Sequence, residues 1–475
     1  MHDELAFLSA ADTARLIRGG EVSPVEVVQA YLARIERLDS TLRAYITVTA
    51  EGALAAAREA ERAQQARAAI GPLFGVPVAV KDQFWTRGVL TTNGSRAYRD
   101  FVPTEDATVI TRLAKAGAIL LGKLTMSELA LGGTRAPAWG IARNPWDLER
   151  TPGESSSGSG VALAAHLCAA SVGEDTGGSG RTPAAYCNAV GLRPTYTRVS
   201  RHGMMAACWF LDQAAPMTKT VEDCGLVLGA IAGYDPNDPS TSRRSVPDYC
   251  VNLGRGLGGL RVGLIRELHE HADVHPEVKS AVEAAAETLR ALGADVREVS
   301  IPLIAHAGAI YVAIGDTEGA GACDELLRDQ PQMLDPASRT RLQAASLVPF
   351  KLYNRAMKAR VLLRGQFMNA LSQVDVLLSA TSPFPAPKHT ALTAPFSDAD
   401  DVRARFFFRR AYTGSYALAS LPAISVPCGF TSERLPIGLQ IGGRPFAEAT
   451  LLQTAHAYEQ ATQWHKQRAP AATAG

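Results

Sequence analysis

The chain has 475 residues, 47% of them hydrophobic and 20% charged, which supports a large buried core and argues against disorder. Its 48 Lys and Arg residues nearly balance 47 Asp and Glu residues, so no net charge attracts nucleic acid or an anionic membrane. Seven scattered Cys residues without CxxC spacing indicate reduced thiols, not a disulfide framework or a zinc site. The charged N-terminus lacks an apolar signal segment, so we expect a cytoplasmic protein without a membrane span.

The first 70 residues predict helices. Residues 23–26, Ser-Pro-Val-Glu, have the pattern of a capping box with proline at the first helical position. Apolar residues then recur at helical spacing between 25 and 35. A second, alanine-rich helix is expected over residues 51–68.

The pattern changes after Gly71. Residues 74–80 form a short apolar run with a proline near its start, which is typical of a buried strand. A helix is expected over 107–116 and a strand over 118–121. This alternation of helix and strand favours an α/β fold.

Residues 151–160, TPGESSSGSG, are rich in Gly and Ser. The segment feeds directly into an apolar helix expected over 161–170, so we interpret it as a structured loop and not as a flexible linker. A strand is expected at 169–173, followed by a tight glycine turn at 175–179. Thr182-Pro183 has the pattern of an N-cap and first residue of the next helix.

The later elements are predicted from apolar runs, or from apolar residues at helical spacing, that lie between turn residues. Strands are expected at 260–265, 295–301, 374–379 and 423–427, and helices at 275–292 and 448–461. We expect one large domain. Its parts are an N-terminal helical segment (1–70), a core that carries the site (71–240), a variable lobe that shapes the cleft (241–400) and a C-terminal completion of the core (401–475).

Several motifs do not support a function. Gly254–Gly259 resembles a dinucleotide-binding fingerprint but precedes a strand instead of following one. Neither Ser155 nor Ser179 stands in GxSxG, so a nucleophile elbow is absent. The histidines between 269 and 275 straddle a loop and a helix start, and we interpret them as surface residues.

Lys81, Ser155 and Ser179 remain, and each alone is unremarkable. Together, the segments around them match a known pattern: GVPVAVKD (75–82), PGESSSGSG (152–160) and DTGGSGRTPAA (175–185). The chain therefore resembles the amidase signature family, with weaker likeness over most of its remaining length. The resemblance implies a large mixed twisted sheet with helices on both faces and a smaller inserted lobe.

The resemblance also implies roles for the three residues. Ser179 is the nucleophile, Ser155 the bridging serine after a cis peptide bond, and Lys81 the base. Burial can hold a lysine neutral, which makes it able to accept a proton. No metal or cofactor is implied.

The glycine turn suggests a second role for its backbone. The N–H groups of residues 176–179 (Thr176, Gly177, Gly178 and Ser179) can point at one position and form an oxyanion hole. Asp175 and Arg181 flank the turn, and we expect them to be scaffold residues that are ion-paired or bonded to the loop backbone, and not catalysts. In the loop, Glu154 and Ser157 replace family glycines.

The substrate is less specified. Candidate substrate-binding residues are Gly132, Gly133, Thr134, Ser156 and Trp209. Aromatic residues near the expected cleft favour an aryl or apolar amide, ester or carbamate as substrate. We expect the enzyme to be a monomer or a homodimer.

Two alternatives stay open. Residues 198–223 are similar to the glutamine-hydrolysing A-subunit of tRNA-dependent amidotransferases, which implies ammonia transfer to a partner. The other alternative is an inactive binding scaffold, against which the intact Lys81, Ser155 and Ser179 argue.

Overall fold

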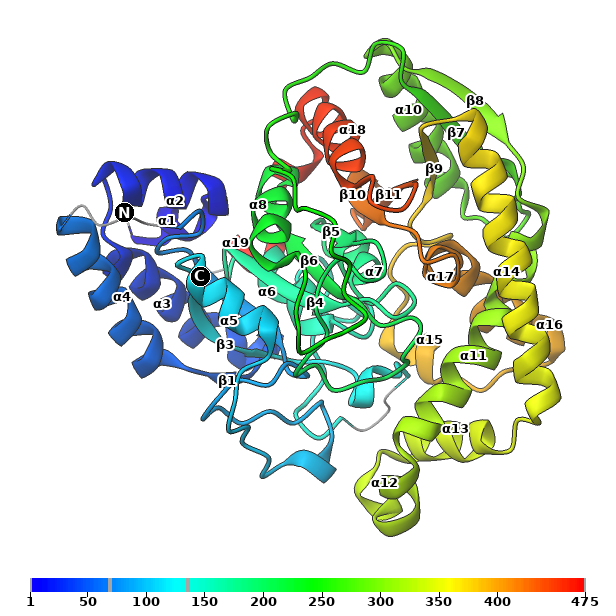
Figure 1. Ribbon diagram of the computed structural model, residues 1–475, viewed down its shortest axis with the longest axis horizontal. Helices are drawn as coiled ribbons and strands as arrows, with labels where there is room; N and C mark the ends of the chain where they lie inside the picture. Colours follow the sequence, from blue (N-terminus) through cyan, green and yellow to red (C-terminus); the bar gives the residue numbers. More distant parts are fainter. Residues whose placement is uncertain (1, 67–70, 134–136, 474–475) are drawn as a thin grey trace.

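The computed structural model describes residues 2–66, 71–133 and 137–473. It contains an 11-stranded mixed sheet with the order β1-β3-β2-β4-β6-β5-β10-β11-β9-β7-β8 (Figure 1). The strands are β1 (Tyr45–Val48), β2 (Pro77–Lys81), β3 (Ile119–Leu124), β4 (Ala170–Glu174), β5 (Val190–Arg193), β6 (Ala214–Thr218), β7 (Arg261–Ile265), β8 (Asp295–Val299), β9 (Val376–Ala380), β10 (Ala423–Phe430) and β11 (Pro436–Gly443).

Two groups of parallel strands lie within the sheet. Strand β2 runs parallel to both β3 and β4, and β7 runs parallel to both β8 and β9. The remaining neighbours pair antiparallel. Strands β2 and β4 are buried at every residue, as the continuous apolar runs in the sequence predict.

Helices cover both faces of the sheet, which confirms the predicted fold class. One layer consists of contacting helices that pack on β3, β6, β10 and β11: α5 (Thr108–Lys115), α8 (Val221–Ile231), α18 (Glu448–Ala461) and α10 (Pro276–Ala291). A second group includes α6 (Ser157–Ala164) and α7 (Arg181–Tyr186), which contact each other and the central strands. Helix α17 (Arg409–Leu418) packs against β11 through Tyr416, whose ring lies where a side chain at Gly442 would stand.

The N-terminal helices pack beside the β1 edge of the sheet (Figure 1). They are α1 (His2–Phe7), α2 (Ala10–Gly19), α3 (Pro24–Leu42) and α4 (Ala50–Gln65). The predicted capping box at the start of α3 is present, because the Ser23 and Glu26 side chains both bond backbone N–H groups.

The segment between β8 and β9 is helical and stands beside the sheet (Figure 1). It contains α11 (Ala307–Ala322), α12 (Asp324–Asp329), α13 (Pro336–Ser346) and the long α14 (Phe350–Gln373). The remaining helices are α9 (Arg266–His269), α15 (His389–Thr393), α16 (Ala399–Val402), a π-helical turn (Arg403–Phe408) that leads into α17, and α19 (Pro470–Thr473); short 3-10 turns lie at 96–98, 128–130, 302–306, 331–333 and 464–466. None of the helices in the described residues combines the length and hydropathy that crossing a membrane requires.

The predicted boundaries of two helices near the site are wrong. Helix α6 begins at Ser157 and ends at Ala164, whereas a helix over 161–170 was expected, so it includes the last four residues of the Gly/Ser-rich segment 151–160. Helix α7 begins at Arg181 with Gly180 as its N-cap residue, and not at Thr182-Pro183. Helix α6 is buried along its whole length and α7 at every residue except Thr182, and this tertiary packing overrides the local capping signal.

Candidate active site

The site lies where β2 and β4 end side by side. Lys81 is the last residue of β2, and Glu174 is the last residue of β4. The two strands are parallel, with Val80 opposite Val172, so their carboxyl ends meet at the same edge. Ser155 precedes α6, and Ser179 stands in the turn that follows β4. The fold therefore brings all three predicted residues to one place.

Lys81 has two close partners. Its Nζ lies 2.7 Å from Ser155 Oγ and 2.8 Å from Glu174 Oε2. The Lys81 and Glu174 side chains are both fully buried. Burial lowers the pKa of Lys81 below its ordinary value, while the Glu174 carboxylate works in the opposite direction. The direction agrees with the predicted role, but the neighbouring carboxylate was not foreseen.

Glu174 continues into a buried acidic network. The Thr176 hydroxyl lies within hydrogen-bond distance of Glu174 Oε1 and 2.7 Å from Asp212 Oδ1. A hydroxyl donates only one proton, so one of the two carboxyl groups is expected to carry a proton of its own. Burial, followed by repulsion from Glu174, raises the pKa of Asp212 to about 7. Asp212 Oδ2 accepts two backbone N–H groups, from Ala207 and Cys208, at 2.8 Å each.

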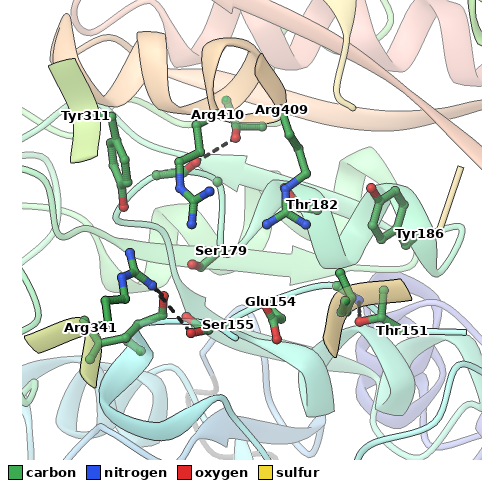
Figure 2. Close-up of a pocket in the computed structure, with 18 residues that line it drawn as sticks. Thr151, Glu154, Ser155, Ser179, Thr182, Tyr186, Tyr311, Arg341, Arg409 and Arg410 are labelled. Atoms are coloured by element: carbon green, nitrogen blue, oxygen red, sulfur yellow. Dashed lines mark hydrogen bonds between the residues drawn. The ribbon is translucent and has the colours of Figure 1, made fainter. Parts of the chain in front are cut away.

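Ser155 and Ser179 open into one cavity (Figure 2). The empty space at this site is about 650 Å³ when the open solvent at its mouth is included. The peptide bond between Glu154 and Ser155 is cis, as the resemblance implied. Ser155 is almost fully buried, whereas Ser179 is partly exposed to the cavity.

The glycine turn is closely covered by two side chains. A Cβ atom added at Gly177 would lie 2.4 Å from the Tyr311 ring. At Gly178, where φ is +123°, an added Cβ would lie 2.1 Å from Thr413 Oγ1. Thr413 Oγ1 also donates to the Gly177 carbonyl at 2.6 Å. Glycine at both positions therefore allows α11 and α17 to approach the backbone of the turn.

The backbone N–H groups of the turn are not equivalent. Gly178 N–H donates to Asp175 Oδ1 at 2.8 Å, so this predicted oxyanion-hole donor is already engaged. The N–H groups of Thr176, Gly177 and Ser179 form no hydrogen bond with any residue that the structure describes. Three of the four predicted donors remain for an oxyanion.

Asp175 and Arg181 form the predicted ion pair beneath the turn. Arg181 Nε lies 2.9 Å from Asp175 Oδ2, and Arg193 Nη1 lies 3.3 Å from Oδ1. All three side chains are fully buried. Burial alone would raise the pKa of Asp175, but Arg181 and Arg193 hold it well below its ordinary value. Asp175 is therefore held in its ionised form, and its carboxylate anchors the turn.

The predicted substrate-binding residues do not all lie at the cavity. Gly132 lines the cavity, and Gly133 lines an adjoining one and donates its N–H to Glu154 Oε2 at 2.9 Å. Thr134 lies outside the described residues. The Ser156 hydroxyl bonds both backbone groups of Glu174 and does not face the cavity. Trp209 is 58% exposed and lies against the Arg201 guanidinium, away from the cavity lining.

Sequence reasoning missed several residues around the site. Glu174 ends an apolar strand directly before the glycine turn. An acidic residue at the end of a buried strand could have indicated a partner for Lys81. Arg341 lies in the variable lobe (241–400), and Arg409 and Arg410 lie in the C-terminal part of the core; no local pattern indicated that these three arginines line the cavity.

The histidine group contacts other side chains. His269 pairs with Glu283 at 3.2 Å, and the His271 ring stacks on Phe408 with centroids 3.9 Å apart. Within residues 2–66, 71–133 and 137–473, no group of three His, Cys, Asp or Glu residues is arranged to hold a metal ion.

Comparisons with known proteins find relatives that are similar in sequence and in fold. The family model described as Amidase matches residues 26–452. The A-subunit of glutamyl-tRNA(Gln) amidotransferase from Geobacter sulfurreducens (strain ATCC 51573 / DSM 12127 / PCA) is 43% identical over 474 residues, which cover 94% of this chain and 96% of that protein.

Two solved structures are similar along nearly the whole chain. One is described as an unexpected vestigial protein complex that reveals the evolutionary origins of an s-triazine catabolic enzyme. It superposes with a TM-score of 0.88 at 30% identity and covers 95% of this chain and 98% of its own. The other is 6-aminohexanoate cyclic dimer hydrolase complexed with substrate, with a TM-score of 0.88 at 28% identity over 98% of this chain and 100% of its own.

Proposed function

The chain belongs to the amidase family, and on that premise we propose that it cleaves carboxylic amides through an acyl-enzyme on Ser179. Ser155 and Lys81 act as its proton relay. The observation that carries this proposal is the 2.7 Å contact between Lys81 Nζ and Ser155 Oγ, beside a cavity into which Ser179 also opens. A serine hydroxyl becomes a competent nucleophile only when a nearby base accepts its proton.

The contacts of Lys81 suggest how the relay works. In the structure, Lys81 Nζ donates to both Ser155 Oγ and Glu174 Oε2. Once Lys81 is neutral, its lone pair can accept the proton of the Ser155 hydroxyl across the same contact, while one N–H still donates to Glu174. Ser155 in turn accepts the proton of Ser179 while the Ser179 oxygen attacks the amide carbon. The proton then returns along the same path to the departing nitrogen as the C–N bond breaks. A water molecule then attacks the acyl-enzyme with the same relay accepting its proton, which releases the acid and restores Ser179.

The attack places negative charge on the former carbonyl oxygen. We assign its stabilisation to the backbone N–H groups of Thr176, Gly177 and Ser179, which are not engaged by the described residues. Loss of one such donor costs about 3 kcal/mol of the barrier.

The test is a substrate panel of aryl amides, aliphatic amides, esters, carbamates and glutamine, together with a fluorophosphonate probe. Wild-type protein should be labelled and Ser179→Ala should be neither labelled nor active, while its thermal unfolding is unchanged. Ser432→Ala, at an exposed serine, is the matched control. Turnover that survives Ser179→Ala would contradict the proposal. An unlabelled, inactive wild-type protein would instead support a binding scaffold.

A second candidate function is that of the glutamine-hydrolysing A-subunit of a tRNA-dependent amidotransferase. The curated relatives bear that name, at 39% to 43% identity over at least 94% of this chain, and they favour this candidate over a self-contained amidase. Glutaminase activity that requires the other components of such a complex would support it. Full activity on a small amide by the isolated chain, with no response to those components, would contradict it.

A further inference from the structure

The cavity is lined by three arginines opposite the two serines. Arg409 and Arg410 are the first residues of α17, and Arg341 belongs to α13. Figure 2 shows the guanidinium groups of Arg409 and Arg410 pointing from α17 towards the side of the cavity on which Ser179 lies, while Arg341 approaches from the other side.

Only one of these arginines has an acidic partner among the described residues. Arg341 binds Asp316 with two hydrogen bonds, of 2.9 and 2.5 Å. Arg410 donates to the carbonyl of Phe406 at 2.6 Å and lies over the Phe406 ring, 3.9 Å from its centroid. The backbone N–H of Arg409 donates to the Phe407 carbonyl, but its side chain forms no hydrogen bond or ion pair with the residues that the structure describes. Two adjacent guanidiniums therefore face the cavity without a carboxylate.

The acidic residue in the cavity lining does not compensate for them. Glu154 Oε2 accepts the N–H of Gly133 at 2.9 Å, and Glu154 lies at the serine side of the cavity in Figure 2. Burial and the positive charges of Arg341 and Arg409 lower the pKa of Arg410 to about 9. Arg410 is thus still charged near neutral pH, and holding like charges together in a partly buried site is unfavourable unless an anion joins them.

We propose that Arg409 and Arg410 bind a carboxylate of the substrate, so that the cleaved molecule is a small amide with a second, anionic end. This inference rests on the proposed function. A guanidinium presents two parallel N–H donors that match a carboxylate. The same pair of charges disfavours a substrate with an ammonium group near that carboxylate, and so disfavours glutamine relative to its analogue without the amino group.

The experiment compares amides that differ by one group. Glutaramate adds a terminal carboxylate to butyramide, and glutamine adds an α-ammonium to glutaramate. We expect kcat/KM for glutaramate to exceed that for butyramide by about tenfold or more, and to exceed that for glutamine. N-acetylglycine against N-methylacetamide tests a carboxylate on the leaving-group side. No preference for the anionic member of either pair would overturn the proposal, and so would a preference for glutamine over glutaramate.

Binding separates the anion site from catalysis. Calorimetry with glutarate on Ser179→Ala protein should show binding that Arg410→Gln, and separately Arg409→Gln, weakens by about tenfold or more. Arg403→Gln, at an arginine of the preceding turn whose side chain is 73% exposed, should not change it. The binding result of each arginine variant is interpreted only if thermal unfolding shows that the variant is folded. If one of the two variants does not fold, the other still tests the proposal.

The outcomes distinguish the two proposals. Arginine-dependent glutarate binding without turnover of any amide would support the anion site and contradict the proposed function. Equal turnover of butyramide and glutaramate, with no effect of either arginine on glutarate binding, would contradict the anion site alone.

Discussion

Lys81 and Glu174 form a buried ion pair at the ends of two adjacent parallel strands, with Nζ 2.8 Å from Oε2 and both side chains 0% exposed. The attraction between them opposes the desolvation that lowers the pKa of Lys81. The same carboxylate holds the amine at Ser155. Glu174 is thus a positioning residue that also influences how readily Lys81 accepts a proton.

Glu174→Gln should shift the pH dependence of activity. The substitution keeps the side-chain shape but removes the charge that raises the pKa of Lys81. The pKa of Lys81 then falls further, and the neutral amine is present at lower pH. We expect the rising limb of kcat/KM against pH to move towards acid by about one unit or more.

The control is Glu287→Gln, because the Glu287 side chain is 71% exposed on α10. It should leave the profile in place. A limb that stays fixed in Glu174→Gln, with only a lower plateau, would indicate that Glu174 merely supports the structure.

Lys81→Met should abolish activity and destabilise the fold. It leaves the Glu174 carboxylate buried without its cation, which costs about 3 kcal/mol or more. Combining it with Glu174→Gln removes both charges and should recover most of that stability while activity stays absent, because no base remains. Urea denaturation measures the free energies of unfolding. Measurable turnover in the double variant would contradict the assignment of Lys81 as base.

Asp212→Asn should change how stability depends on pH. The pKa of Asp212 is raised to about 7 in the fold, against about 3.9 in an unfolded chain. Its contribution is therefore fully present below pH 4 and is lost as pH rises through 7. Asparagine resembles the neutral acid at every pH, so the variant should be the more stable protein at pH 8, by about 1 kcal/mol or more.

Thermal unfolding between pH 4 and 8 measures this effect. Asp324→Asn, at a side chain that is 73% exposed, should follow the wild-type curve. A variant that is less stable than wild type at pH 8 would show that the ionised carboxylate, and not the acid, supports the fold.

Gly177→Ala should disrupt the catalytic turn. The added methyl group would lie 2.4 Å from the Tyr311 ring, so either the turn or α11 must move. We expect kcat to fall by about a hundredfold or more, since misplacement of a reacting group by about 1 Å has that effect. Gly365→Ala, at a helical glycine of α14 with open space around it, should retain activity and be neutral or stabilising. Activity near that of wild type in Gly177→Ala would contradict a rigid turn.

Local patterns were reliable where the signal was itself local. The capping box at Ser23 and the helix that begins at Pro276 were predicted because capping and apolar spacing lie within a few residues. The predicted start of α6 was wrong. The Gly/Ser composition of residues 157–160 disfavours a helix, and only their close packing against neighbouring backbone allows one. Trp209 was chosen by its aromatic character, but it lies exposed against the Arg201 guanidinium and does not line the cavity.

The sequence by itself determined which chemical groups the proposed function uses: a lysine at a strand end, two serines in glycine-rich loops, and a glycine turn that leaves room for backbone donors. Only the tertiary structure decided what surrounds them. Glu174 meets Lys81 because β2 and β4 pair in parallel, and Arg410 faces Ser179 because α17 returns from more than 200 residues away. Charge, burial and pKa arise from such long-range contacts, and a reading of neighbouring residues cannot supply them.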